Sequence, residues 1–324
     1  MKSSKIFALI FSIIIIVSIV YGIGLNKLIE VLKHFNLDYL PIIFLLLIFD
    51  YVLAGLNTWV LANSFKKTSL KYMIKASFIT LVYAVITPGK ISDFLMIPFL
   101  RNQKLTLNQS TITVGFDKII SLFVKIFFGL IGTIFFLKRF NLLFLGVPLA
   151  ALGLLILIVL LIRSKKFLNF IKTKILRKYS FLFKGFSKDL KKYIKNNKKA
   201  IYTNVMITIM KSVLEAFIFF TLFLSFNQPT NIVIIFFMFS LLSVIMLLTF
   251  PIGVSGVGVR EFVGIVVFGA VGVGSAVVFS SFILRIFLIY LINLITVFLF
   301  KEDLNFLKNS KFFKRLKLKK IVTH

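Results

Sequence analysis

Residues 250–262 read FPIGVSGVGVREF, and this stretch interrupts one of the most apolar parts of the chain. Proline and glycine break a spanning helix, and hydrocarbon rejects the adjacent arginine and glutamate. Irregular backbone at membrane depth is tolerated only where protein or a water-filled cavity satisfies its polar groups. The stretch therefore predicts a turn that lines the interior of a membrane protein.

The composition of the whole chain supports a membrane protein. Of its 324 residues, 59% are hydrophobic and 15% are charged, and the mean hydropathy is +1.02. Soluble domains are roughly 45–50% apolar and about 25% charged. A helix of about 20 apolar residues crosses a bilayer. We therefore expect an all-α polytopic protein with full spans at 6–24, 40–62, 109–137, 141–162, 201–226 and 276–300.

Two further apolar stretches, 70–108 and 231–274, are each broken by proline and glycine. Basic residues concentrate in three other segments, 63–75, 163–200 and the tail from 301, which the positive-inside rule places in the cytoplasm. All three lie on one side only if each broken stretch is a re-entrant hairpin. The first would enter from the cytoplasm and the second from outside. We therefore predict a protein of the cell membrane with six full spans and two opposed hairpins. Both of its termini would lie in the cytoplasm.

The two broken stretches resemble each other. In each, a proline with glycine precedes an acid followed by phenylalanine, and the two prolines are 163 residues apart (251 − 88), about half the chain. This is the outline of an inverted-topology repeat, which is common in transporters. We expect one membrane domain over 1–324, with halves 1–162 and 201–324 joined by a basic interfacial connector, 163–200. The predicted hairpin-turn residues are Pro88, Gly89, Pro251, Gly253, Gly256 and Gly258.

Eleven charged residues lie inside apolar segments, six of them basic. Each charge at the centre of a spanning helix costs roughly 2.5–3.5 kcal/mol, so these residues must pair, face water or reach the interface. Helical spacing places four polar stripes on four helices, for example Lys211 with Glu215, or Asp117 with Lys125. The stripes indicate a shared polar interior, which is either a set of ion pairs that fix helix packing or a groove for a polar cargo. The basic excess favours an anionic headgroup.

Several classes of function are excluded. The chain has no cysteine, and its histidines are His34 and His324, which rules out disulfides, haem ligation and most zinc sites, so no metal or other cofactor is expected. No Ser/His/Asp set can form, and no Walker loop for ATP is present. The net charge is +30, and the Lys and Arg residues concentrate at the ends of apolar runs. This distribution favours binding to a membrane surface over binding to nucleic acid.

Three segments carry a resemblance to a known family: TPGKISDFL at 87–95, FDK at 116–118 and PIGVSGVGVREF at 251–262. Together with Arg285 and Trp59, they resemble the membrane domain of lysylphosphatidylglycerol synthase, of the multiple peptide resistance factor family. The chain has Ser92-Asp93 where that family usually has Gly-Glu. The resemblance implies a stand-alone flippase-like domain that moves a lipid between leaflets, without the cytosolic synthase domain. It does not identify the lipid.

The sequence thus predicts a lipid translocase whose partners are membrane lipids, either an anionic or phosphate-bearing phospholipid or a polyprenyl-phosphate-linked lipid. Arg260 and Arg285 would contact phosphate, and acids such as Glu261 would hold those arginines, bind a cationic headgroup or carry a coupling proton. Two alternatives stay: a membrane enzyme that modifies lipid phosphates with Asp93 or Glu261 as base, and a non-catalytic scaffold for a partner enzyme. The candidate translocation residues are Arg260, Glu261, Arg285, Asp93, Lys90, Asp117, Lys118, Lys211 and Glu215.

Overall fold

The fold is described by a computed structural model, and all regular secondary structure in the part it describes is helical, as predicted. The predicted turn residues Pro88, Gly89, Pro251, Gly253 and Gly256 lie outside this part, as does most of the expected span 141–162. The described residues are 2–86, 94–135, 146, 148–153, 156, 186–248 and 257–302.

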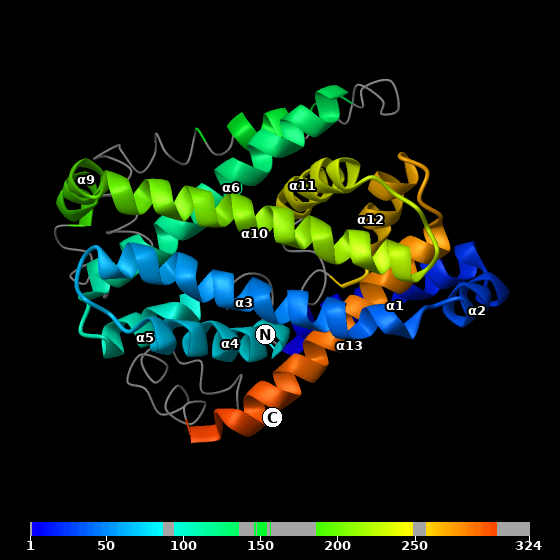
Figure 1. Ribbon diagram of the computed structural model, residues 1–324, viewed down its shortest axis with the longest axis horizontal. Helices are drawn as coiled ribbons and strands as arrows, with labels where there is room; N and C mark the ends of the chain where they lie inside the picture. Colours follow the sequence, from blue (N-terminus) through cyan, green and yellow to red (C-terminus); the bar gives the residue numbers. More distant parts are fainter. Residues whose placement is uncertain are drawn as a thin grey trace.

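Among the described residues, four helices are long and apolar enough to cross a membrane; two lie along the long axis of the molecule and two cross it obliquely (Figure 1). They match four of the six expected spans. Each of these four runs forms a continuous helix because its middle contains no proline and no two adjacent glycines. Helix α10 packs against the other three. The four helices are α3 (Leu40–Asn63), α6 (Leu107–Phe135), α10 (Lys198–Ser225) and α13 (Ser275–Leu299).

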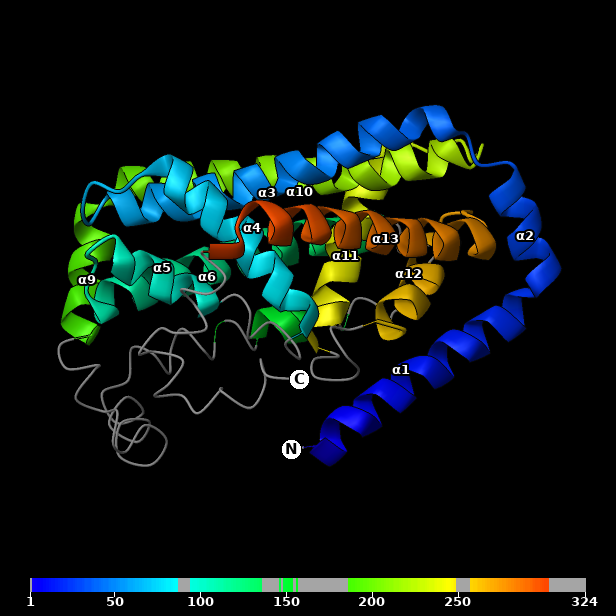
Figure 2. The same cartoon turned by 90° about the horizontal axis from the view of Figure 1, so that it is seen from below.

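A bent helix pair is the candidate for a fifth span among the described residues. Helix α1 (Lys2–Ile23) meets the amphipathic helix α2 (Leu25–Lys33) at Gly24, and the two axes differ by 81°. Gly24 has a φ of +89°, which glycine adopts without strain, so the chain can turn sharply there (Figure 2). The described residues therefore hold four spans, or five if this bent pair counts as one.

The first broken stretch forms a helix pair that returns to the end of the molecule at which it begins. The pair consists of helix α4 (Leu70–Ile86) and helix α5 (Met96–Asn102), and residues 87–93 between them lie outside the described part. The start of α4 and the end of α5 are tied together, because Asn102 Nδ2 donates to the Tyr72 hydroxyl at 2.8 Å. The two ends of this stretch therefore lie side by side, and its re-entry from the cytoplasm stays a prediction.

The second broken stretch forms a similar pair in the opposite half of the molecule, α11 (Ile232–Leu248) and α12 (Val259–Gly269) (Figure 1). The two helices pack against each other, and Gln228, before α11, lies beside Gly274, after α12. Helix α12 begins at Gly258, whose φ of +90° and close approach to the backbone of Ser12 both require glycine. That the two pairs enter the membrane from opposite sides stays a prediction.

Part of the basic connector folds as helix α9 (Phe186–Asn196), which covers one end of the spanning helices. Its lysines are exposed, while the Tyr193 ring is buried and stacks on Phe65, with ring centroids 4.3 Å apart. The Tyr193 hydroxyl accepts from Ser64 Oγ at 3.0 Å and donates to the Leu61 carbonyl at 3.3 Å. Burial raises the pKa of Tyr193. Tyr193 thus anchors α9 to the C-terminal end of α3, and its ring also contacts Phe116 of α6.

Candidate functional site

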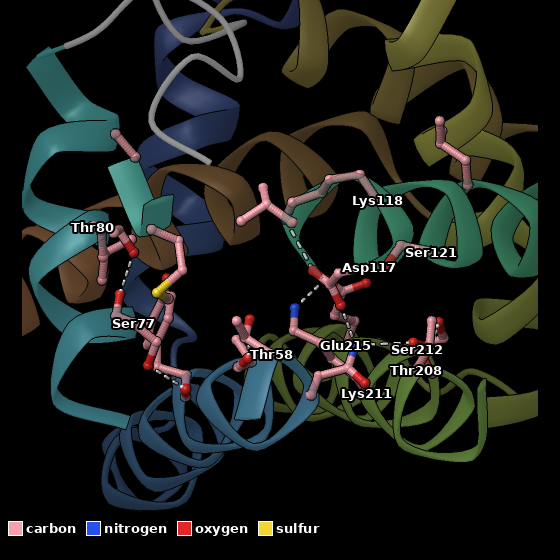
Figure 3. Close-up of a pocket in the computed structure, with 18 of the residues that line it drawn as sticks. Thr58, Ser77, Thr80, Asp117, Lys118, Ser121, Thr208, Lys211, Ser212 and Glu215 are labelled. Carbon is pink, nitrogen blue, oxygen red and sulfur yellow. Dashed lines mark hydrogen bonds and ion pairs between the residues drawn. The ribbon is translucent and has the colours of Figure 1, made fainter. Parts of the chain in front are cut away.

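A cavity of about 410 Å³ lies between α3, α4, α6 and α10, with Phe94 and Met96 completing its wall. Figure 3 shows polar side chains from the four helices facing this common space. Its volume falls within the range of about 300–1,000 Å³ that is usual for ligand pockets. The polar lining residues are Asn57, Thr58, Ser77, Thr80, Asp117, Lys118, Ser121, Lys125, Thr208, Lys211, Ser212 and Glu215.

One side of the cavity is a chain of ion pairs. The Lys211 Nζ lies 3.0 Å from Asp50 Oδ1 and 3.3 Å from Glu215 Oε1. The second oxygen of Glu215 accepts from Lys125 Nζ at 3.1 Å. Both carboxylates are buried, so each lysine offsets charge that hydrocarbon would otherwise reject. The predicted i,i+4 pair of Lys211 with Glu215 is confirmed, and it connects three helices.

A second polar cluster surrounds Asp117 on α6. The Asn57 Nδ2 donates to Asp117 Oδ1 at 2.7 Å and to Thr208 Oγ1 at 3.0 Å. The Asn204 Nδ2 donates to the Asn57 carbonyl at 3.0 Å, and Lys118 Nζ lies 3.6 Å from Asp117 Oδ2. Charge-assisted hydrogen bonds of this kind are stronger than neutral ones, so they hold the carboxylate in place. The cluster joins α3, α6 and α10 around the cavity.

The arrangement favours binding of a polar group over covalent chemistry. Three lysines and two carboxylates line the cavity, and ammonium groups are suited to phosphate oxygens. Among the described residues, no group of three or more His, Cys, Asp or Glu side chains could hold a metal ion. The cavity therefore offers ionic and hydrogen-bonding contacts inside an apolar helix bundle.

The predicted pair at the start of α12 is bound internally. The Arg260 Nη2 lies 2.9 Å from Glu261 Oε1, and the other Glu261 oxygen accepts the backbone N–H of Gly258. Glu261 is 0% exposed, and the Arg260 guanidinium lies over the Phe282 ring, 5.6 Å from its centroid. Neither residue lines the cavity. Glu261 thus caps the N-terminus of α12.

The predicted site residues are therefore divided. Arg285 lies over Phe219 of α10, with 5.4 Å between the guanidinium carbon and the ring centroid, and it does not line the cavity. Lys90 and Asp93 fall outside the described residues. The predicted residues that the structure brings to the cavity are Asp117, Lys118, Lys211 and Glu215.

Sequence reasoning did not place several of these side chains in the candidate site. Asp50 and Lys125 belong to predicted polar stripes, and their spacing from Asn57 and Asp117 could have added them. Hydroxyl side chains such as Ser77 carry no comparable signal. The Ser77 Oγ donates to the backbone carbonyl of Tyr51 at 2.8 Å, a satisfied arrangement that is common in any spanning helix.

Comparison with known proteins supports the motif-based resemblance. The family model described as the lysylphosphatidylglycerol synthase TM region matches residues 5–296, which includes every described helix that lines the cavity. No curated protein and no solved structure matched the chain. The match covers far more than half of the 324 residues. With a helical membrane fold and this match, the chain belongs to the lysylphosphatidylglycerol synthase TM region family.

Proposed function

We propose that this protein is a lipid translocase that moves a phosphate-bearing membrane lipid between leaflets. The lipid headgroup crosses through the polar cavity, and the acyl chains stay in the surrounding bilayer. Family membership supports a lipid-related role at the membrane. The proposal includes both a phospholipid and a polyprenyl-phosphate-linked lipid, since both present a phosphate on an apolar anchor.

The observation that carries the proposal is a charged cavity inside an apolar bundle. Lys118, Lys125 and Lys211 line it together with Asp117 and Glu215. A headgroup that leaves water loses its hydration, and unpaired charge in the membrane interior is expensive. Fixed ammonium, carboxylate and hydroxyl groups replace that hydration at the middle of the path. Ion pairs that served packing alone would be more stable in a closely filled interior than beside a cavity of about 410 Å³.

A leaflet assay in proteoliposomes tests the proposal. A phospholipid with a nitrobenzoxadiazole label is reduced by external dithionite, and the protein should accelerate the loss of inner-leaflet signal. Lys125→Met removes one phosphate partner and should slow this movement by at least about tenfold, the effect of one lost charge-assisted contact. Lys71→Met, which removes an exposed lysine of α4 outside the cavity, is the matched control.

Two results would contradict the proposal. Equal rates in liposomes with and without the wild-type protein would reject translocation. A chemically altered lipid, detected by mass spectrometry after incubation, would instead favour the lipid-modifying enzyme. The earlier assignment of Arg260 to phosphate is tested in the same assay, because wild-type movement by Arg260→Ala would reject it and leave Arg260 with its observed role beside Glu261.

A further inference from the structure

Arg285 is a partly buried cation without an anionic partner among the described residues. No described carboxylate lies within ion-pair distance of its guanidinium, and its Nε is buried without a hydrogen-bond acceptor. It contacts the face of the Phe219 ring instead. An arginine in a membrane interior is costly unless it is paired, and a buried donor without an acceptor adds to that cost. Such a residue indicates a ligand or a second arrangement of its neighbours.

The neighbours of Arg285 provide that second arrangement. Phe219, whose ring it covers, lies one helical turn after Glu215 on α10. The charge of Arg285 accordingly acts on Glu215 and Asp50, the two carboxylates of the ion-pair chain. In the resting arrangement both carboxylates are committed to lysines, since Asp50 contacts Lys211 and Glu215 contacts Lys125 and Lys211. Lys125, Lys211 and Glu215 face the cavity, whereas Asp50 and Arg285 do not line it. The chain of charges thus runs from the cavity wall to α13.

Among the described residues, the charges of this ion-pair chain and Arg285 do not balance. Lys125, Lys211 and Arg285 contribute three positive charges, and Asp50 and Glu215 contribute two negative charges, which leaves one positive charge (3 − 2). The neighbouring pair of Asp117 with Lys118 is neutral and does not change the sum. One monoanionic group in the cavity would make the cluster neutral. A phosphodiester carries a single negative charge and several acceptor oxygens, which fits this requirement.

We propose that Lys211 and Lys125 bind the phosphodiester of a monoanionic lipid and that Asp50 then passes from Lys211 to Arg285. Asp50 occupies the phosphate position on Lys211 while the cavity is empty of lipid. Arg285 is a positioning residue, because it receives the displaced carboxylate and does not contact the lipid. This inference rests on the proposed function and specifies its substrate class. It also gives the otherwise unpaired guanidinium a partner in the loaded state.

The test uses the full chain in liposomes that contain labelled phosphatidylglycerol, which is monoanionic, or labelled phosphatidylcholine, which is zwitterionic. Arg285→Gln should slow phosphatidylglycerol movement by at least about tenfold, as expected for a lost charge-assisted contact. Arg285→Lys should restore part of the rate because it restores the charge. Thermal unfolding of Arg285→Gln should stay close to wild type, since Arg285 makes no ion pair with the described residues at rest.

A binding measurement separates this inference from the proposed function. Dioctanoylphosphatidylglycerol should bind the wild-type protein more tightly than it binds Arg285→Gln, and dioctanoylphosphatidylcholine should show no such difference. If the wild type moves no lipid but shows this difference, the binding site is supported and translocation is not. Wild-type binding and movement by Arg285→Gln would overturn the partner exchange, as would a loss of stability as large as that of Lys211→Met. Equal preference for the two lipids would overturn the monoanionic requirement.

Discussion

The two helix pairs α4–α5 and α11–α12 occupy corresponding places in opposite halves of the molecule, but their surroundings differ (Figure 1). Ser77, Thr80 and Met96 of the first pair line the polar cavity. The second pair packs into a core of phenylalanine rings, in which Phe268 of α12 lies 5.8 Å from Phe219, centroid to centroid. One half thus holds a polar space, and the other half is filled with side chains.

On the proposed function and the predicted inverted repeat, this difference suits a translocase. In an inverted repeat, the same elements surround the substrate path from both sides, and one half can be hollow while the other is packed. On the proposed function, the cavity at α4–α5 and the aromatic core at α11–α12 represent one state of that alternation. Substitutions in each half test this contrast, because they measure how closely that half is packed.

The largest expected effect lies in the aromatic half. Phe268 is 0% exposed, so Phe268→Ala should lower the free energy of unfolding by about 3–5 kcal/mol, the usual cost of a large buried aromatic side chain. Phe262 on the same helix is 55% exposed, and Phe262→Ala is the matched control with a much smaller effect. Thermal unfolding in detergent compares them. Similar losses for both would mean that this half is not closely packed.

The ion-pair chain of the cavity half should be slightly less sensitive. Lys211→Met leaves Asp50 without its lysine and Glu215 with Lys125 alone. Breaking a buried pair costs about 3–5 kcal/mol, and the neighbouring cavity should bring the loss to the lower end because water can reach the freed carboxylates. Denaturant unfolding measures it against Lys71→Met. A stability equal to wild type would show that the pairs do not hold α3 to α10.

A close helix contact beside the cavity should show a smaller effect. A Cβ at Gly55 would lie 2.6 Å from the Ile74 Cα, so Gly55→Ala forces α3 and α4 apart and should cost about 1–3 kcal/mol. Gly115 of α6 has open space around its Cβ position, so Gly115→Ala should be neutral or slightly stabilising. If the two variants unfold at the same temperature, the close approach of α4 to α3 is not required.

The smallest effect is expected at the anchor of α9. Tyr193→Phe keeps the stacked ring and removes the hydrogen bonds with Ser64 and the Leu61 carbonyl, which should cost about 1 kcal/mol. Tyr202 is exposed, so Tyr202→Phe serves as the control and should unfold like wild type. Proteolysis of the connector, followed by mass spectrometry, should show faster cleavage near α9 in Tyr193→Phe only. Equal cleavage would place the anchor elsewhere.

Much of the fold was predictable from the sequence, because its signals are local. Apolar runs define α3, α6, α10 and α13, and Gly258 marks the start of α12. The spacing of Lys211 and Glu215 places them on one helix face. The pairing of Lys211 with Asp50 was not predictable, since it depends on how α3 crosses α10.

The choice between the two halves was also beyond the sequence. Both halves contain proline, glycine and interior charges. The sequence pattern therefore predicted site residues in the segment 251–262 as well as in the segment 87–118. Packing decides the difference, because the rings around Phe219 fill the space between α10, α12 and α13. Arg260 and Glu261 consequently pair with each other, and Asp117 and Lys211 face the cavity.

The most direct test of the central claim uses the absence of native cysteine in the chain. Single variants Ser121→Cys, on the cavity wall, and Ser281→Cys, where the native side chain is 0% exposed in the aromatic half, are treated in liposomes with a membrane-impermeant thiol reagent. We predict that Ser121→Cys is modified, that dioctanoylphosphatidylglycerol slows this modification, and that Ser281→Cys does not react. If Ser121→Cys reacts no faster than Ser281→Cys, or reacts at the same rate with and without the lipid, the cavity is not the headgroup site.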